Sequence, residues 1–371
     1  MINICILKEN KNNEFRVPLV PGDIFYLKNK YKNFNFFIQP SADRIISDEE
    51  YYKVGCKKYN KQKIDLFLSI KEINKKIIQK NQNFLMFSHT IKGQSYNMPM
   101  LKKLLDKNCS LIDYELLKNK NNQRVLGFGW FAGIMGTFLT LCKHINYNKI
   151  NKLTYHSNEI IKILKKFNFK NTKILITGDG LVSKGSQFLL KKIGFKEIHN
   201  NSSSENPCFR VLKPIDYYSR VDGKFNLNDL LIGNGKYKNK FTDYIGYYDI
   251  LISCHYWDNR FPKLFSLKDI SKNFFKIIGD ITCDIKGSIP TTIKSTTLKS
   301  PYYNFKGISV MAVDNLPSAL PLEASEKFSS KLKNLLPKII KTLDKDTIED
   351  FYIVKKGYLS YRFLNLINHL I

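Results

Sequence analysis

Two glycines that follow a short apolar segment are the residues with the clearest chemical potential in this chain of 371 residues. Gly178 and Gly180 come directly after Ile174–Thr177, whose mostly β-branched residues are typical of a strand buried on both faces. A glycine turn between a strand and a helix lets backbone approach a pyrophosphate, whose charge the helix N-terminus stabilises. The pattern therefore indicates a dinucleotide-binding strand–helix–strand unit over residues 173–198.

This pattern departs from the usual dinucleotide fingerprint at two places. Ser183 stands where the third glycine is usual and Gly185 follows two residues later, so an ordinary strand–turn–helix stays open as an alternative. The second apolar segment ends at Ile198 without the acidic residue that would bind the ribose 2′-hydroxyl of NAD. Serines 202–204 and Arg210 follow as candidate partners of a 2′-phosphate. We therefore expect NADP as the cofactor, with NAD as the alternative.

The first half of the chain reads as alternating strands and helices. Such alternation favours a parallel α/β sheet. The expected strands are 2–7, 34–38, 66–70, 84–88 and 111–112, and the expected helices are 21 to about 32, 48–54 and 98–105.

The second half of the chain also reads as helices and strands, on both sides of the glycine turn. A glycine-rich helix is expected over 129–141, and strands over 249–254, 277–281 and 309–313, whereas residues 202–247 have the composition of an insertion or a long loop on the cofactor side. An amphipathic helix is expected over 323–343, long enough to return to the first half, with one apolar face made of Phe328, Leu332, Leu335, Leu336 and Ile339.

We therefore predict an α/β protein of two Rossmann-like domains, whose parallel sheets flank a central cleft. Residues 1–128, completed by 323–371, are the expected substrate-binding and catalytic domain. Residues 129–322 are the expected NAD(P)-binding domain. A chain of this length can give each domain its own core.

Composition argues against several classes of protein. The net charge is +28, but 53 of the 60 basic residues are lysines spread among asparagines, with no basic helix typical of a nucleic-acid binder. The seven cysteines form no CxxC pair, which indicates free thiols in a reducing compartment and no metal site. No segment has the length and apolar character of a membrane span, and the first residues read as a strand and not as a targeting sequence. Cytoplasm is the expected compartment.

Eight segments, in order along nearly the whole chain, resemble the lysine-ketoglutarate reductase family. This family, also called lysine-forming saccharopine dehydrogenase, is related to alanine dehydrogenase and to the nucleotide domain of transhydrogenase. The segments are FFIQPSADRIISDEEY (36–51), FSHTIKGQSYNM (87–98), LIDYELL (111–117), RVLGFGWFAG (124–133), TGDGLVSKGSQ (177–187), ISCHYWDNRFPKL (252–264), GDITCDIKGSI (279–289) and DNLPSALPLEAS (314–325).

The resemblance implies an oxidoreductase acting on CH–NH bonds, which uses NADPH to join L-lysine and 2-oxoglutarate into saccharopine and also runs in reverse. It implies proton transfer by Lys71 and His89. Lysine 71 has no signal of its own beyond its place at a strand end, and a lone histidine such as His89 is also common in cores. The cofactor residues implied beside Gly178, Gly180 and Ser183 are Leu181, Val182 and Asp284.

For the substrates, the resemblance implies that Arg16, Arg124 and Lys92 lie near the carboxylates, and that Glu72 and Glu115 tune the proton-transfer pair. Saccharopine carries three carboxylates, and guanidinium binds a carboxylate with two parallel hydrogen bonds. Arginine is scarce in this chain, with seven residues, so these two stand out, although either arginine also suits a structural ion pair.

Two other functions stay open. A carboxyalkyl amino acid synthase of the same superfamily would join a different 2-oxoacid to ornithine or lysine, and GSIPTTI at 287–293 resembles that group as well. A non-catalytic NADP-binding regulator would keep the fold without the chemistry. In each case the expected partners are small molecules, with no nucleic acid, membrane or metal.

Overall fold

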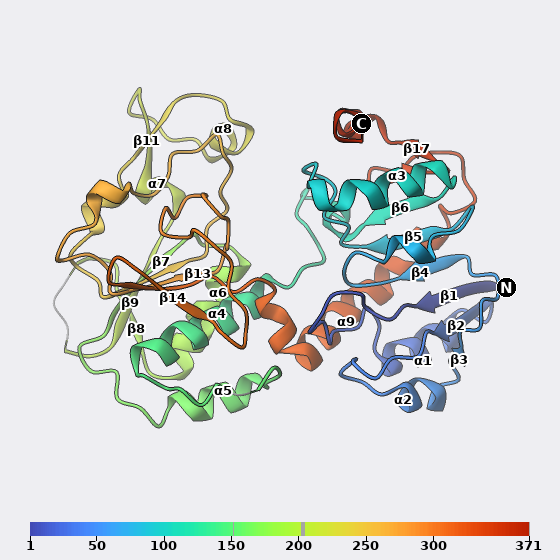
Figure 1. The fold of residues 1–371 in the computed structure, drawn as a ribbon, viewed down its shortest axis with the longest axis horizontal. Coiled ribbons are helices and arrows are strands. Elements are labelled where there is room, and N and C mark those ends of the chain that lie inside the picture. The colour runs from blue at the N-terminus through green and yellow to red at the C-terminus, as the bar shows by residue number, and fades with distance from the viewer. Residues whose placement is uncertain (151, 202–204, 371) are drawn as a thin grey trace. The chain divides into compact units, whose positions relative to one another are not determined.

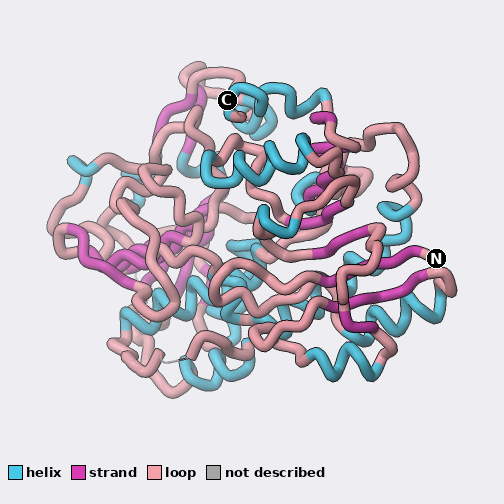
Figure 2. Tube along the Cα trace, turned by 45° about the vertical axis from the view of Figure 1, so that its right-hand side comes forward, coloured by secondary structure: helices cyan, strands magenta, loops and turns pink. Residues whose placement is uncertain are grey.

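The computed structural model describes residues 1–150, 152–201 and 205–370. They form two compact units: unit 1 comprises Met1–Phe128 and the chain from Pro321 onwards, and unit 2 comprises Gly129–Leu320. Each unit is built around its own sheet of mainly parallel strands with helices packed against it, which confirms the predicted α/β class (Figures 1 and 2).

The sheet of unit 1 has the strand order β17-β16-β6-β5-β4-β1-β2-β3. Strands β1 to β6 pair in parallel, whereas β16 and β17 add an antiparallel edge that the sequence did not reveal. The chain leaves β1 first towards β2 and then returns to β4, so a topological switch point lies between β1 and β4. The strands are β1 Ile2–Ile6, β2 Phe34–Ile38, β3 Lys57–Lys58, β4 Leu66–Leu68, β5 Asn83–Met86, β6 Ser110–Asp113, β16 Tyr352–Lys355 and β17 Tyr358–Leu359.

The helices of unit 1 are α1 Pro21–Lys30, α2 Asp48–Lys53, α3 Met98–Asp106 and α9 Pro321–Ile340. Helix α9 returns from the far end of the chain and lies with the β1–β4 strands of unit 1, as predicted (Figure 1). Its residues Phe328, Leu332 and Leu336 are buried in one core with Ile4 of β1 and Leu66 of β4. Burying this apolar stripe is what holds the helix against the sheet.

The sheet of unit 2 has the order β14-β15-β13-β12-β7-β9-β8, parallel except for β14. Its strands are β7 Lys173–Thr177, β8 Lys196–Glu197, β9 Cys208–Leu212, β12 Ile250–Ser253, β13 Ile277–Asp280, β14 Tyr302–Phe305 and β15 Ile308–Met311. A separate ribbon is formed by β10 Tyr218–Arg220 and β11 Tyr237–Asn239. The helices are α4 Gly129–His144, α5 Ser157–Leu164, α6 Leu181–Lys192, α7 Pro214–Tyr217 and α8 Leu227–Ile232.

The prediction that 202–247 is an insertion or a long loop is wrong. Strand β9 lies inside this range and occupies the place next to β7, in the register Ile174↔Phe209 and Thr177↔Leu212. The predicted second strand of the nucleotide unit, ending at Ile198, shrinks to β8 on the outer side of β9. Arg210 interrupts the apolar pattern of the five-residue strand β9, and so short an interrupted segment carries little periodic signal.

No helix in the described ranges has both the length and the apolar character needed to cross a bilayer.

Candidate active site

Four polar residues lie where adjacent parallel strands of unit 1 end. Glu9 comes after β1, Lys71 after β4 and His89 after β5, and Asp113 is the last residue of β6. Because these strands are neighbours and point the same way, their carboxyl ends meet at one edge, beside the switch point between β1 and β4. The edge brings the predicted proton-transfer pair together, with Lys71 Nζ 3.4 Å from His89 Nε2.

The imidazole of His89 is held between two neighbours. Its Nδ1 lies 2.9 Å from Glu72 Oε2, and since a carboxylate only accepts hydrogen bonds, Nδ1 carries the hydrogen and Nε2 turns its lone pair towards Lys71. Burial opposes ionisation of Glu72, but the hydrogen bond and charge of His89, together with Lys71, outweigh it and lower the pKa of Glu72. This arrangement fixes both the tautomer and the orientation of His89.

The backbone of His89 adopts the left-handed region, with φ of +49°. Such a conformation is uncommon for a residue with a side chain and persists only where the surroundings enforce it. The preceding Ser88 supplies that constraint, because its N–H and Oγ donate to Asp113 Oδ2 at 2.8 and 2.6 Å and its carbonyl accepts from Asn97 Nδ2 at 2.9 Å. Burial raises the pKa of Asp113 to about 6.

The amine of Lys71 is unusually acidic. Burial, and then the positive charges of Arg16 and Lys11, lower its pKa from 10.5 to about 8, although Glu14 and Glu72 act in the opposite direction. At pH 7 a group with that pKa is neutral in about one molecule in ten, against fewer than about one in a thousand for an ordinary lysine. Lys71 can therefore serve as a base near neutral pH.

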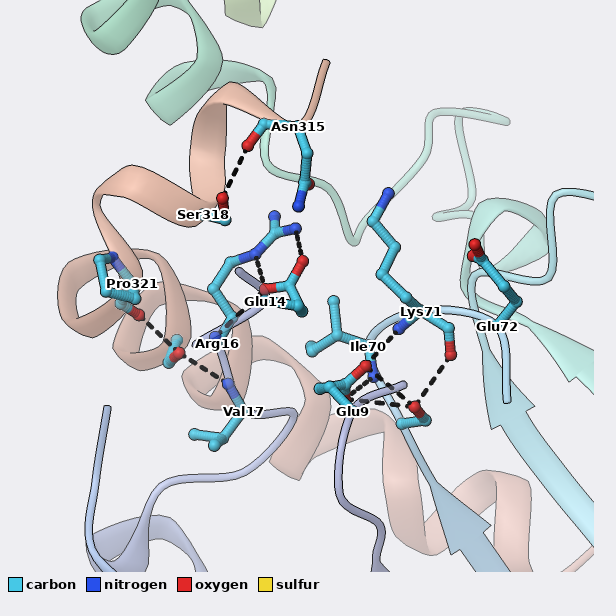
Figure 3. A network of polar contacts seen from close by, with 12 residues as sticks. Glu9, Glu14, Arg16, Val17, Ile70, Lys71, Glu72, Asn315, Ser318 and Pro321 are labelled. Atoms are coloured by element: carbon cyan, nitrogen blue, oxygen red, sulfur yellow. Dashed lines mark hydrogen bonds and ion pairs between the residues drawn. The ribbon is translucent and has the colours of Figure 1, made fainter. Parts of the chain in front are cut away.

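The carboxylate of Glu9 binds the backbone that carries Lys71, a role that the sequence did not reveal. Its carboxylate accepts the N–H groups of Ile70 at 2.6 Å and Lys71 at 2.9 Å, and the hydroxyl of Ser69 at 3.1 Å (Figure 3). Burial, and then the charge of Glu14, raises the pKa of Glu9 to about 7. Its place shortly after the end of a strand was the available signal.

Arg16 forms a buried ion pair with Glu14, a residue that the sequence analysis also missed. The guanidinium binds Glu14 through Nε at 2.7 Å and through Nη2 (Figure 3). It also stacks 4.1 Å from the ring centroid of Phe128. Arg16 is only 1% exposed. The N–H of the next residue, Val17, donates to Ser325 Oγ of α9 at 2.9 Å, which ties this loop to the C-terminal helix.

Arg124 and Glu115 form a second, more accessible pair. Arg124 Nη2 donates to Glu115 Oε2 at 2.7 Å, with the two side chains 50% and 31% exposed. The groups that shift the pKa of Lys71 do not include Glu115, so the acid beside the Lys71–His89 contact is Glu72. Lys92 is exposed in the loop beyond His89, where its N–H donates to Gln94 Oε1 at 3.2 Å.

In unit 2, the glycine turn after β7 suits a dinucleotide pyrophosphate. Gly178 has φ of +84°, and a Cβ there would lie 2.7 Å from the Cα of His255, so the turn requires glycine. Gly180 is the N-cap of α6, and a Cβ there would meet no atom within 4 Å. The open space beside Gly180, at the N-terminus of a helix without an acidic residue in its first turn, fits a phosphate group.

The third glycine of the fingerprint has a packing role, and Gly185 takes it here. A Cβ on Gly185 would lie 2.0 Å from the carbonyl oxygen of Trp130, and one on Gly133 would lie 2.0 Å from that of Val182, so α4 and α6 pack backbone to backbone. Ser183 is buried, and its hydroxyl accepts from Gln187 Nε2 at 3.0 Å. Leu181, the first residue of α6, is 53% exposed.

Arg210 and Asp284, also predicted to contact the cofactor, lie on other segments of unit 2 than the glycine turn. Arg210 lies within β9 opposite Leu175, where its Nη1 donates to Asn201 Oδ1 at 2.8 Å and its guanidinium packs 5.1 Å from the ring centroid of Tyr244. Asp284 is exposed in the loop after β13, and its carbonyl accepts from the N–H of Gly287. The predicted Ser202, with Ser203 and Ser204, falls outside the described residues. Among described residues, no group of three or more His, Cys, Asp or Glu side chains could hold a metal ion.

Two family models match this chain. Residues 5–135 match the family "Alanine dehydrogenase/PNT, N-terminal domain", and residues 216–362 match "Alanine dehydrogenase/PNT, C-terminal domain". The alpha-aminoadipic semialdehyde synthase of Arabidopsis thaliana is 28% identical over 97% of this chain and 40% of its own length. The Bos taurus protein, "Alpha-aminoadipic semialdehyde synthase, mitochondrial", is 26% identical over 86% of this chain and 41% of its own length. This chain thus spans about two fifths of these relatives.

A relative of similar length is the saccharopine dehydrogenase [NAD(+), L-lysine-forming] of Schizosaccharomyces pombe, which is 25% identical over 96% of this chain and 97% of its own length. Among solved structures, an L-alanine dehydrogenase superposes over the full length of both chains with a TM-score of 0.69 at 16% identity. A transhydrogenase from Sinorhizobium meliloti covers 96% of this chain and 98% of its own, with a TM-score of 0.64 at 13% identity. These matches confirm the resemblance drawn from the eight segments: the chain belongs to the alanine dehydrogenase/PNT family.

Proposed function

We propose that this chain is an oxidoreductase of CH–NH bonds that catalyses the NADPH-dependent condensation of L-lysine with 2-oxoglutarate to saccharopine, reversibly. The single observation that carries the proposal is the 3.4 Å contact between Lys71 Nζ and His89 Nε2 at the switch point of unit 1. This condensation requires one group that accepts a proton and one that donates a proton beside the reacting atoms. The name of the relative in Schizosaccharomyces pombe, which contains saccharopine and L-lysine, supports the choice of product and of amino acid.

The condensation begins with attack of the neutral ε-amine of the substrate lysine on the keto carbon of the oxoacid. A C–N bond forms, the nitrogen gives up a proton, and the carbonyl oxygen becomes a hydroxyl. Lys71, with its pKa lowered to about 8 by burial, accepts the proton from nitrogen. That proton crosses the 3.4 Å contact to Nε2 of His89, whose ring Glu72 holds, and His89 gives it to the carbonyl oxygen. A second proton, taken from solvent and relayed the same way, lets the hydroxyl leave as water when the C–O bond breaks. The nicotinamide, when bound, supplies the hydride that reduces the resulting C=N bond.

Binding roles follow the placement of the charged groups. Arg124 and Lys92 are exposed enough to contact substrate carboxylates. Arg16 is 1% exposed and paired with Glu14, so a substrate carboxylate would reach it only if its surroundings rearranged. Unit 1 would then bind the substrates. Unit 2 would bind the dinucleotide through Gly178, Gly180 and the N-terminus of α6.

The test is consumption of NADPH by the purified protein with lysine plus 2-oxoglutarate, with ornithine plus pyruvate as the matched pair. Consumption with lysine and 2-oxoglutarate, and formation of saccharopine by mass spectrometry, are expected. Turnover with ornithine and pyruvate alone would instead identify a carboxyalkyl amino acid synthase. Tight NADPH binding without turnover of either pair would favour the regulator.

A further inference from the structure

Strand β7, which leads into the glycine turn of unit 2, lies between β12 and β9. Strand β9 is the neighbour on the side of β8, where the sequence placed the residue that contacts the ribose. Thr177 of β7 pairs with Leu212 of β9, and the N–H of Gly178 donates to the carbonyl of Leu212 at 2.8 Å. Lys213 is therefore the first residue beyond the carboxyl end of the strand next to the turn. The end of β8, where the sequence placed this position, is separated from β7 by the whole of β9.

In doubly wound sheets, the position at the end of this neighbouring strand reads the 2′ substituent of the adenosine ribose. An acidic residue there accepts a hydrogen bond from the 2′-hydroxyl of NAD, and a cation accommodates the 2′-phosphate of NADP. The Lys213 side chain is exposed. Its backbone is fixed, because its N–H donates to Asp216 Oδ2 at 2.7 Å at the start of α7.

Two carboxylates close to Lys213 in the sequence or in the turn add negative charge, which opposes the binding of a phosphate. Asp179 lies within the glycine turn and is exposed, and Asp216 follows Lys213 by three residues. One oxygen of Asp216 accepts the Lys213 N–H, so its carboxylate is turned back onto the backbone of its own turn. The Lys213 ammonium, on a flexible four-carbon stem, is the group at this strand end that can reach outward to a ligand.

We propose that Lys213 selects the cofactor, by pairing its ammonium with the 2′-phosphate of NADP. The inference rests on the proposed binding of a nicotinamide dinucleotide and names the residue behind its choice. The sequence indicated Arg210 for this role. Arg210 lies within β9, and its guanidinium instead contacts the side chains of Asn201 and Tyr244.

The experiment measures dissociation constants of NADPH and NADH by calorimetry without substrates, together with adenosine 2′,5′-bisphosphate and AMP as minimal probes. The variants are Lys213→Met, Lys213→Arg and Asp216→Asn. Lys196→Met is the matched control, because it removes the same charge from an exposed lysine of β8 that pairs with Cys208, at the opposite end of β9.

We expect Lys213→Met to weaken NADPH and the bisphosphate about tenfold or more, with NADH and AMP little changed, because a charge-assisted contact is lost. Lys213→Arg should restore most of the affinity, and Lys196→Met should alter none of it. Equal loss for NADPH and NADH in Lys213→Met, or no loss for either, would overturn the role of Lys213 while leaving dinucleotide binding intact. A selective loss of NADH in Asp216→Asn would overturn it too, since Asp216 would then be the residue that reads the ribose. Wild-type protein that binds neither dinucleotide would overturn the proposed function itself.

Discussion

The amine of Lys71 and the imidazole of His89 lie 3.4 Å apart although 18 residues separate them in the sequence. Strands β4 and β5 are parallel neighbours, so the residues beyond their carboxyl ends share one edge of the sheet. At this distance a proton can pass between the two nitrogens. The charges that act on the Lys71 amine are those of Arg16, Lys11, Glu14 and Glu72.

The buried amine of Lys71 should reduce the stability of the folded protein at neutral pH. Its pKa in the folded state, about 8, lies below the 10.5 of an ordinary lysine. Below pH 8 both the folded and the unfolded chain hold the proton, and the penalty of burying the charge is fully present. As pH rises from about 8 to 10.5 the folded state loses the proton first, and the penalty shrinks.

Lys71→Met should therefore stabilise the protein by about 2 kcal/mol at pH 7, with a gain that declines above pH 8. Urea unfolding at a series of pH values measures this, and Lys58→Met, which removes an exposed lysine of β3, is the control with no such gain. A gain for Lys71→Met that is independent of pH would show that the amine is not buried as a charge.

Glu72→Gln should move the rising limb of the pH–rate profile to lower pH. The negative charge of Glu72 favours the ammonium form of Lys71, so its removal lowers the pKa of Lys71 further below 8. Turnover at the optimum should also fall, because the bond that orients His89 is weakened.

The matched control for this shift is Glu115→Gln, which removes an equal charge from a residue paired with Arg124 and should leave the profile in place. Equal shifts in the two variants would mean that both carboxylates act on the pair.

The Glu14–Arg16 ion pair should behave as a structural element. Arg16→Ala leaves Glu14 buried without its bidentate partner, and loss of one member of a buried pair costs about 3 to 5 kcal/mol. The double variant Glu14→Gln/Arg16→Met should recover much of that loss in urea unfolding. A KM for the oxoacid that stays raised in the stable double variant would assign Arg16 a substrate role as well. A loss below about 1 kcal/mol in Arg16→Ala would contradict the buried pair.

Gly180→Val should abolish dinucleotide binding and leave the fold intact, because no atom lies within 4 Å of its Cβ and the side chain would fill the space proposed for the pyrophosphate. Calorimetry with NADPH measures the binding and circular dichroism the fold. Gly22→Val, also without neighbours within 4 Å but in unit 1, should bind normally. Gly178→Ala should instead damage the fold, given φ of +84° and the Cα of His255 at 2.7 Å. Normal affinity in folded Gly180→Val would place the dinucleotide elsewhere.

Local patterns in the sequence predicted the elements that carry a strong period or turn signal. The glycines of the turn after β7, the strand end at His89 and the apolar face of α9 all depend on neighbours close in sequence, and these features were found. Strand β9 was missed because Arg210 breaks its short apolar pattern, and its place beside β7 is set by pairing at long range.

The supporting residues of the site could not be predicted in the same way. Glu9 acts on Lys71 across 62 positions, and Glu14 gains its importance from burial against Arg16, which no spacing encodes. Lys213 gained its significance only when β9 replaced β8 beside the turn. Chemical roles that depend on which strand is the neighbour require the three-dimensional structure.

The most direct test of the account is the pH dependence of turnover with NADPH, lysine and 2-oxoglutarate for wild-type protein, Lys71→Met and His89→Gln. Wild-type turnover should rise with an apparent pKa near that of Lys71, about 8. Each variant should lose at least about tenfold in turnover with NADPH affinity little changed, and Lys71→Met should lose the rising limb. Near-normal turnover across the pH range in both variants would contradict the central claim that this pair transfers the protons.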